Sequence, residues 1–239
     1  MNLLLRPLRS SLGSKYVMAL TGLGLIGFVI AHMLGNLQIF LGRQALNDYA
    51  HHLEEIPTLL WTARIGLLAI FIVHIAFGLR LWLLNRSARP ERYVHEDTVQ
   101  ATWASRHMLL TGLVILVFVI YHLLHFTLGL TDSAHFKKNV AMVQYDHPEV
   151  KDPARQEYDT AGMVIDGFKQ WPITLVYVIA QIVLGLHLWH GGGSLLQSLG
   201  LNNKRWRPCV SGLGAALALI VVVGNCSIPL AILFGWRPQ

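Results

Sequence analysis

Five long apolar stretches, separated by polar connectors, dominate the hydrophobic pattern of the chain. They cover approximately residues 16–41, 59–84, 108–130, 171–196 and 210–234, and none contains Asp or Glu. A bilayer core about 30 Å thick needs roughly 20 apolar residues in a helix, and a single segment satisfies its backbone groups in lipid only as a helix. The pattern therefore predicts an all-α integral membrane protein with five transmembrane helices, forming one membrane domain over residues 1–239.

Composition and charge support a membrane location over a nucleic-acid partner. The chain is 54% hydrophobic and 13% charged, whereas soluble domains carry about a quarter charged residues. The net charge of +6 comes from short basic clusters between the apolar stretches, which is typical of an orientation signal. Cys209 and Cys226 both lie in or beside the last stretch, so the sequence indicates no disulfide framework.

The charges of the connectors predict how the helices cross the membrane. The N-terminus and the second and fourth connectors, with their helix ends, hold eleven basic residues against three acidic ones, and the opposite side holds seven against ten. By the positive-inside rule we expect a cytoplasmic N-terminus and lipid contacts all round the bundle. The long polar connector over residues 131–170 should then form a loop or cap on the outer side.

Histidines occur inside each of the first four apolar stretches and not in the fifth. They are His32, His74, His122 with His125, and His187 with His190. Ionisable side chains inside a membrane are costly and tend to be functional. One such histidine could simply bond a neighbouring carbonyl group, but its recurrence on four consecutive helices favours a shared role.

The depths of these histidines define two levels. His32 and His122 lie nearer the outer ends of their helices, whereas His74 and His187 lie nearer the cytoplasmic ends; at 1.5 Å per residue the two levels differ by several Å. Two facing imidazoles at one depth suit the axial positions of a haem iron. A zinc site would favour cysteine or carboxylate ligands, and a proton relay would recruit membrane carboxylates, and the apolar stretches hold no Asp or Glu.

His125 and His190 are the rival ligands. Each follows a proposed ligand by three residues, on nearly the same helix face. Spacing favours His122 over His125, because His125 lies close to the end of its helix, but it leaves His187 and His190 open. The remaining histidines lie in connectors or at helix ends, where solvated surface histidine is the default interpretation.

Several segments resemble a known family. They are S-K-Y-V-M-A-L-T-G-L at 14–23, A-H-M-L-G-N-L-Q-I-F-L-G at 31–42, W-T-A-R-I-G-L-L at 61–68, H-I-A-F at 74–77, A-R-P-E-R-Y at 88–93, F-V-I-Y-H-L-L-H-F-T at 118–127 and L-G-L-H-L-W-H-G-G-G-S-L-L-Q-S-L-G at 184–200. Over nearly its whole length the chain resembles the di-haem cytochrome b subunit, of b558 type, of succinate dehydrogenase and fumarate reductase.

The resemblance implies two haems b and assigns their ligands. His32 and His122 match the ligands of the outer haem, and His74 and His187 match those of the inner haem. It further implies a multi-pass subunit of the bacterial inner membrane, without succinate chemistry of its own. Such a subunit anchors a flavoprotein and an iron–sulfur subunit on the cytoplasmic side, exchanges electrons with a quinone, for which we expect menaquinone, and can belong to a higher oligomer of the complex.

Other polar residues near the two levels are candidates for further contacts. For the propionates of the inner haem the candidates are Arg80, Ser105 and Arg106. For a quinone beside the outer haem they are Asn36, Gln38 and Arg64. Interhelical hydrogen bonds for the amides and snorkelling for the arginine are the plainer interpretations. Alternative functions for the whole chain are the haem b anchor of another respiratory dehydrogenase and a non-redox transporter that contains histidines.

Overall fold

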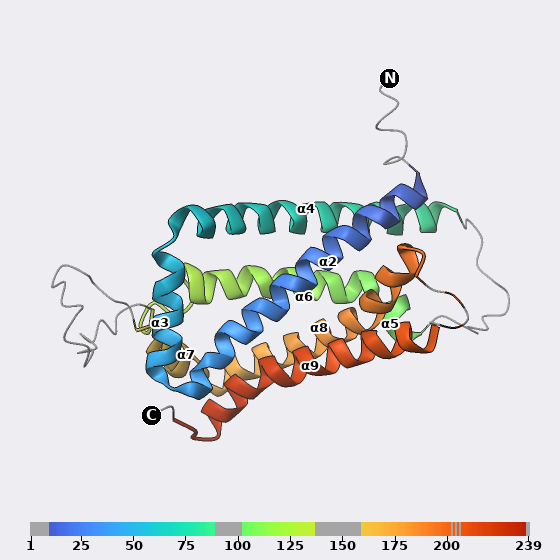
Figure 1. Cartoon of the computed structure of the whole chain (residues 1–239). Coiled ribbons are helices and arrows are strands. Elements are labelled where there is room, and N and C mark those ends of the chain that lie inside the picture. The colour runs from blue at the N-terminus through green and yellow to red at the C-terminus, as the bar shows by residue number, and fades with distance from the viewer. Residues whose placement is uncertain are drawn as a thin grey trace. The chain divides into compact units, whose positions relative to one another are not determined.

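The computed structural model describes residues 10–88, 102–136, 159–201, 203, 205 and 207–237, and within these ranges the regular structure is entirely helical. The elements, drawn in Figure 1, are α2 (Ser11–Asn36), η2 (Leu37–Leu41), α3 (Arg43–Glu54), α4 (Pro57–Ser87), α5 (Trp103–Arg106), α6 (Met108–His122), η3 (Leu123–Thr127), α7 (Thr160–Phe168), α8 (Trp171–Ser198) and α9 (Arg207–Leu233). Element η2 is a 3₁₀ turn, and η3 is a π-helical segment.

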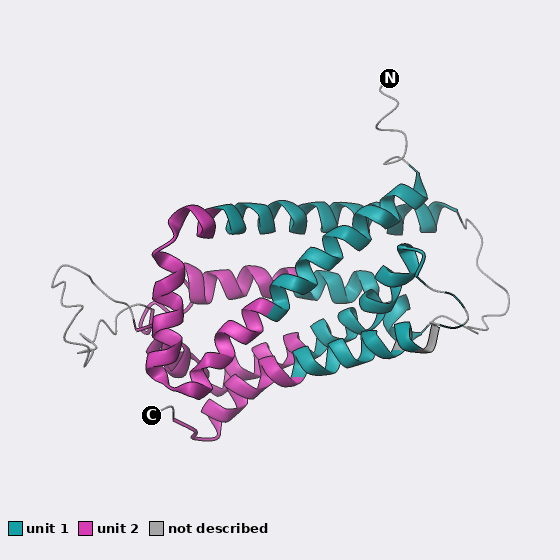
Figure 2. Ribbon diagram, viewed as in Figure 1, with its two compact units in different colours: residues 1–30, 62–115, 182–222 teal, residues 31–61, 116–181, 223–239 magenta. Residues whose placement is uncertain are grey.

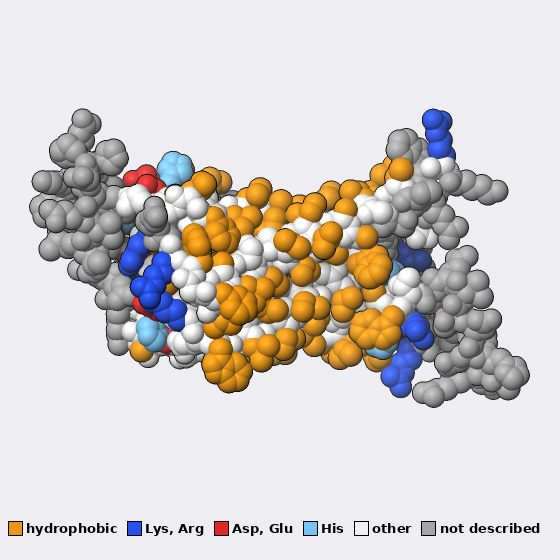
Figure 3. Space-filling model, turned by 90° about the horizontal axis from the view of Figure 1, so that it is seen from below, with side chains coloured by type: hydrophobic (Ala, Val, Ile, Leu, Met, Phe, Trp, Pro, Cys, Tyr) orange, Lys and Arg blue, Asp and Glu red, His pale blue; other side chains and the backbone are white. Residues whose placement is uncertain are grey.

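Five helical segments are long and apolar enough to cross a membrane, as the sequence predicted. They are α2 with η2, α4, α6 with η3, α8, and the part of α9 from Gly212 to Leu233. Figure 3 shows hydrophobic side chains covering the visible face of these helices, with charged side chains near the helix ends. Large apolar side chains such as Leu20, Ile65, Val117 and Leu219 are more than half exposed. Lipid is the environment that such surfaces require.

The contacts divide the described chain into two compact units, coloured in Figure 2. The first unit takes residues 1–30, 62–115 and 182–222, and the second takes 31–61, 116–181 and 223–239. Each membrane-spanning helix contributes residues to both units. His74 and His187 fall in the first unit, and His32 and His122 fall in the second, so each unit contains one of the predicted histidine pairs.

The core of the first unit lies between α8 and α9. Leu188, Ala218 and Val221 are its buried residues, and side chains of α2 pack against them. Small residues allow the two helices to approach closely, because a Cβ atom on Gly192 would lie only 3.2 Å from the Cα atom of Gly214. The run of small residues in the fifth stretch therefore serves helix packing.

The core of the second unit gathers around Tyr177 of α8. Its buried members are Ile39, Leu46, Ala161, Val164, Ile165, Phe168, Tyr177, Ile228 and Ile232. Two short helices, α3 and α7, supply five of these residues, and the sequence predicted neither helix. Prediction from apolar length misses them because both are short, with 12 and 9 residues, and lie in connectors of mixed polarity. Within the connector predicted as a loop or cap over 131–170, residues 160–168 form the helix α7, while residues 137–158 and the 89–93 part of the A-R-P-E-R-Y segment lie outside the described residues.

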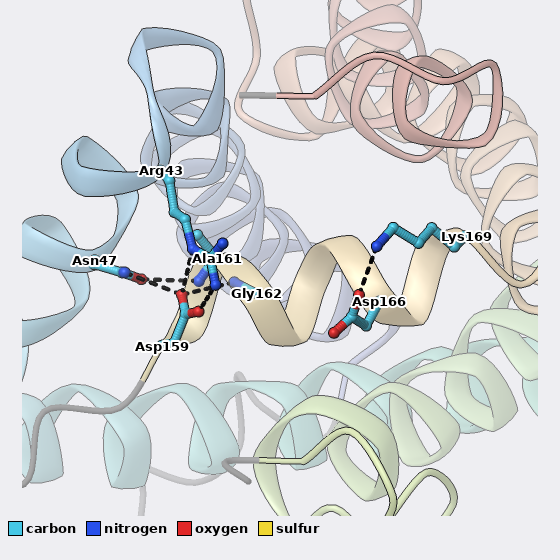
Figure 4. A network of polar contacts seen from close by, with 7 residues as sticks. All are labelled: Arg43, Asn47, Asp159, Ala161, Gly162, Asp166 and Lys169. Carbon is cyan, nitrogen blue, oxygen red and sulfur yellow. Dashed lines mark hydrogen bonds and ion pairs between the residues drawn. The ribbon is translucent and has the colours of Figure 1, made fainter. Parts of the chain in front are cut away.

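A buried carboxylate fastens α7 to α3 (Figure 4). Asp159 caps the N-terminus of α7 by accepting a hydrogen bond from the Gly162 backbone N–H at 2.8 Å. The same carboxylate accepts hydrogen bonds from Arg43 Nε at 3.2 Å and Asn47 Nδ2 at 3.1 Å, and it forms an ion pair with Arg43 Nη2. Asn47 in turn accepts the Ala161 N–H at 2.8 Å. Because Asp159 and Asn47 are buried, this network fixes the two short helices to each other.

Candidate functional site

The second unit brings His32 and His122 together. His32 lies near the end of α2 and His122 is the last residue of α6. Their ring centroids are 5.8 Å apart and the rings are nearly perpendicular, with an interplanar angle of 86°. His32 is exposed and His122 is half-buried, so the pair presents two imidazoles that face each other from two helices.

Tyr177 holds His122 from the neighbouring helix α8. The distance between the His122 Nδ1 atom and the Tyr177 hydroxyl oxygen is 3.2 Å. Phe118 and Phe126 flank the histidine ring, with centroids 5.9 Å away in both cases. The hydrogen bond uses one ring nitrogen of His122 and leaves the other, Nε2, available for a ligand.

His74 of the first unit is held by a threonine on another helix. Thr21 Oγ1 of α2 lies 3.0 Å from His74 Nδ1 and 2.7 Å from the backbone oxygen of Val17. A carbonyl oxygen can only accept, so the single hydroxyl proton of Thr21 goes to Val17 and the imidazole N–H donates to the threonine oxygen. This arrangement places the proton of the neutral ring on Nδ1 and leaves Nε2 as a free metal-binding nitrogen.

His187 has the same arrangement on the other two helices. Thr111 Oγ1 of α6 lies 3.1 Å from His187 Nδ1, 3.1 Å from the Met108 backbone oxygen and 3.2 Å from that of His107. The hydroxyl again turns its proton to the helix backbone and accepts from the imidazole. His74 and His187 belong to the same compact unit.

Glycines stand beside both rings of the first unit. A Cβ atom on Gly22 would lie 3.5 Å from the Cε1 atom of His74, and one on Gly112 would lie 3.6 Å from the Cε1 atom of His187. Any larger side chain at either position would extend towards the imidazole. The two glycines therefore keep space open next to the rings.

Thr21 and Thr111 are residues that the sequence prediction missed, although a sequence signal for them exists. The tetrapeptide L-T-G-L occurs at 20–23 and again at 110–113, and in both helices a histidine follows the threonine by eleven residues within F-V-I-x-H. The repeat places one threonine and one glycine at the level of the first-unit histidines and one histidine in the second unit. Helices α2 and α6 thus each contribute residues to both histidine pairs.

The rival histidines have different surroundings. His125 is buried in the π-helical segment η3, with its Nδ1 atom 3.0 Å from the Tyr177 hydroxyl oxygen and its Nε2 atom 3.8 Å from Asp132 Oδ2. Both of its ring nitrogens therefore face protein groups. His190 is half-buried one turn beyond His187 and acts on it electrostatically.

The three propionate candidates all lie in the first unit. Arg80 is partly buried and packs over the ring of Phe77, with its guanidinium carbon 5.8 Å from the ring centroid. Ser105 donates its hydroxyl proton to the backbone oxygen of Thr102 at 2.9 Å. Arg106 is exposed at the end of α5.

The structure gives the surroundings of each quinone candidate separately. Asn36 donates its amide to the backbone oxygen of His32 at 2.7 Å, so its side chain is occupied within its own helix. Gln38 is partly exposed in η2, and Arg64 is exposed on α4 and belongs to the first unit, unlike the two amides. Among the polar residues deeper in the spans, Asn225 donates to Gln181 Oε1 at 2.9 Å, which is an ordinary interhelical hydrogen bond.

The donor set of the described residues consists of histidine pairs. Within the part of the chain that the structure describes, no group of three or more His, Cys, Asp or Glu side chains could hold a metal ion. A bare ion generally needs three or four protein ligands, whereas a haem iron needs only two axial ones. Comparison with known proteins adds no assignment, because no family model, curated protein or solved structure matches the chain.

Proposed function

We propose that the chain is a di-haem cytochrome b that anchors a succinate:quinone oxidoreductase in the membrane. The observation that carries the proposal is that each compact unit contains one of the two histidine pairs, on four different membrane-spanning helices, and that the rings of His32 and His122 lie close together. His32 and His122 would ligate one haem b, and His74 and His187 the other. Bound at these pairs, the haems supply one-electron redox chemistry; the protein supplies the axial nitrogens and the apolar surroundings.

The geometry of the second-unit pair fits a bis-histidine haem. Imidazole nitrogens bind divalent metals at about 2 Å, so two axial ligands on opposite sides of an iron place their ring centroids about 6 Å apart. The centroids of His32 and His122 are 5.8 Å apart. The free Nε2 atoms inferred for His74 and His187, with Gly22 and Gly112 beside the rings, suit the same role in the first unit.

The choice of ligands also follows from the hydrogen bonds. His122 uses only Nδ1 on the protein, whereas both nitrogens of His125 face protein groups. His187 has the threonine partner that fixes its tautomer, and it mirrors His74 in this respect. These contacts support His122 over His125 and His187 over His190.

The remaining parts of the proposal rest on the resemblance of the sequence. A flavoprotein and an iron–sulfur subunit would bind on the cytoplasmic side of the bacterial inner membrane, where the N-terminus would lie. Electrons would pass through the two haems between the iron–sulfur subunit and a membrane quinone, most simply menaquinone. The basic connectors would face those partners and the lipid phosphates.

Haem stoichiometry tests the proposal directly. The protein, produced in membranes with haem available, should carry two haems b per chain when measured by the pyridine haemochrome method. It should also co-purify with a flavoprotein and an iron–sulfur protein. Replacing His122 or His187 with alanine should leave one haem. Replacing His125 or His190 with alanine, as matched controls three residues away, should leave two.

Three outcomes would contradict the proposal in whole or in part. A chain that binds no haem would point instead to a transporter or scaffold. Haem retained in full by both the His122→Ala and His187→Ala variants would show that the ligands lie elsewhere. Haem content as proposed, but with a different dehydrogenase as the co-purifying partner, would favour the haem b anchor of another respiratory enzyme.

A further inference from the structure

A chain of polar side chains leads from His122 to the end of the second unit. The Tyr177 hydroxyl lies 3.2 Å from His122 Nδ1 and 3.0 Å from His125 Nδ1. On its other side, His125 Nε2 is 3.8 Å from Asp132 Oδ2, and Asp132 Oδ1 is 2.7 Å from His135 Nδ1. The chain passes from buried to accessible residues, because the His125 side chain is 3% exposed, that of Asp132 12% and that of His135 42%.

The hydrogen bonds among these polar side chains can all be directed towards the carboxylate of Asp132. If His122 binds a metal through Nε2, its Nδ1 carries the proton and donates to the oxygen of Tyr177. The tyrosine hydroxyl then donates to His125 Nδ1, which leaves the proton of His125 on Nε2, facing Asp132. His135 donates to the other oxygen of Asp132. Every donor therefore points towards the carboxylate, and every ring has a consistent tautomer.

The carboxylate at the end of the chain is well supported. Gln170 Nε2, after the end of α7, donates to Asp132 Oδ2 at 2.9 Å. Tyr121 of α6 interacts electrostatically with Asp132, and its ring stacks on that of His125 with the ring centroids 5.7 Å apart. At the end of α7, Lys169 forms an ion pair with Asp166 at 2.8 Å.

We propose that His135, Asp132, His125 and Tyr177 form a proton-transfer chain that links the water at this end of the second unit to the His122 ring. This proton-transfer chain takes up a proton from that water when the site formed by His32 and His122 is reduced. The inference rests on the proposed haem function. Nothing in that function requires this route, since the family resemblance concerns only the ligands, the partners and the quinone.

The coupling follows from the direction of the hydrogen bonds. With Asp132 ionised, the hydrogen bonds polarise the N–H group of His122, which keeps its proton, and the negative charge at Asp132 would favour the oxidised state of a haem held there. An electron that arrives favours the opposite state, in which the triad of His125, Asp132 and His135 gains a proton. One electron and one proton enter together, and only N–H and O–H bonds form and break.

One step of the chain is longer than a hydrogen bond. The 3.8 Å between His125 Nε2 and Asp132 Oδ2 is an ion-pair distance, so a proton crosses there through one bridging water or after a small rotation of either side chain. The other steps lie within 3.2 Å. This step is therefore the natural point at which substitutions would interrupt transfer.

The pH dependence of the two haem potentials in the full, haem-loaded complex tests the inference. The potential of the haem at His32 and His122 should fall as the pH rises, approaching a tenfold change in the redox equilibrium per pH unit, or about 59 mV for one electron. In the part of the chain that the structure describes, the rings of His74 and His187 have threonine partners, so the potential of the other haem should depend much less on pH. The His187→Ala variant, which should keep only the second-unit haem, identifies which potential is which.

Substitutions in the chain should remove the dependence from one haem only. Asp132→Asn should flatten the pH dependence of the second-unit haem and raise its potential at neutral pH, and Tyr177→Phe should raise it as well. Asp48→Asn serves as the matched control, because Asp48 is an exposed acid of the same unit that pairs only with Gln44, at 2.9 Å, among the contacts described. It should change neither potential.

The outcomes separate this inference from the proposed function. If the complex holds two haems and the Asp132→Asn variant has the same pH dependence as the unchanged protein, the proton chain is wrong and the cytochrome assignment stands. If Asp132→Asn and Asp48→Asn flatten the pH dependence of the potential equally, general electrostatics account for this dependence, and the proposed proton-transfer chain is wrong in this case too. If no haem is bound, the proposed function itself fails.

Discussion

Removing the Asp159 carboxylate should loosen α7 strongly, and the size of the effect can be worked out from its contacts. An Asp159→Ala substitution removes the N-cap of α7, which costs about 0.5–2 kcal/mol. It also leaves the amide of Asn47, a residue only 1% exposed, without its acceptor, at about 1–3 kcal/mol. The Arg43 side chain is 46% exposed, so its guanidinium can return to water and adds little. Local opening of α7 should become easier by about 2–4 kcal/mol.

Hydrogen exchange of the α7 backbone measures this opening. At about 1.4 kcal/mol for each tenfold change, amides of residues 163–168 should exchange roughly 30- to 1,000-fold faster in the Asp159→Ala variant, in protein held in lipid nanodiscs. Lys169→Gln is the matched control, because it breaks only the exposed pair with Asp166 and should change exchange by less than about fivefold. Arg43→Leu should fall between the two.

The reasoning is refuted if the three variants rank differently in how much they accelerate hydrogen exchange of α7. If Arg43→Leu accelerates exchange as much as Asp159→Ala, the ion pair dominates and the argument from the cap and the buried amide is wrong. If Asp159→Ala has no more effect than Lys169→Gln, the network of Figure 4 does not hold α7 in the membrane-bound protein.

Two further predictions concern the first-unit pair. Thr111→Val removes the acceptor of the His187 N–H and should raise the potential of that haem by a few tens of mV, corresponding to about 1 kcal/mol. Redox titration measures this potential, and Thr111→Ser should restore the original value. An unchanged potential in Thr111→Val would show that the hydrogen bond does not act on the ligand. Gly112→Leu extends a side chain towards His187, whose Cε1 lies 3.6 Å from the Cβ position, and should lower the haem content from two to one. Gly66→Leu, where nothing lies within 4 Å, should keep both haems, and equal haem loss in these two variants would refute the steric argument.

The sequence was sufficient for the parts of the fold that depend on long apolar runs. Length and composition alone predict the five spans, because a helix that crosses a membrane must be apolar over about 20 residues whatever it packs against. The predicted second span, 59–84, lies within α4 at 57–87. The levels of His32, His74, His122 and His187 could be read in the same way, since depth along a helix follows from residue number.

Residues outside the spans were harder to place. Helices α3 and α7 depend on each other through Asp159 and Asn47, which lie 112 residues apart in the sequence. Neither helix has the length or the apolar pattern to be predicted alone. The roles of the quinone and propionate candidates stay predictions, because proximity to a connector says nothing about the direction of a side chain; Asn36, for example, turns back to its own helix.

The sequence by itself determined that the chain is a helical membrane protein and on which helices its histidines lie, because both follow from local composition and from counting along the chain. Only the tertiary structure shows which ring nitrogen of His74, His122 and His187 faces a hydroxyl group of another helix. Thr21 meets His74 across 53 residues, and Tyr177 meets both His122 and His125 from a different helix. A hydrogen bond requires two groups within about 3 Å in a fixed orientation, and only the packing of the helices brings such distant residues to that distance.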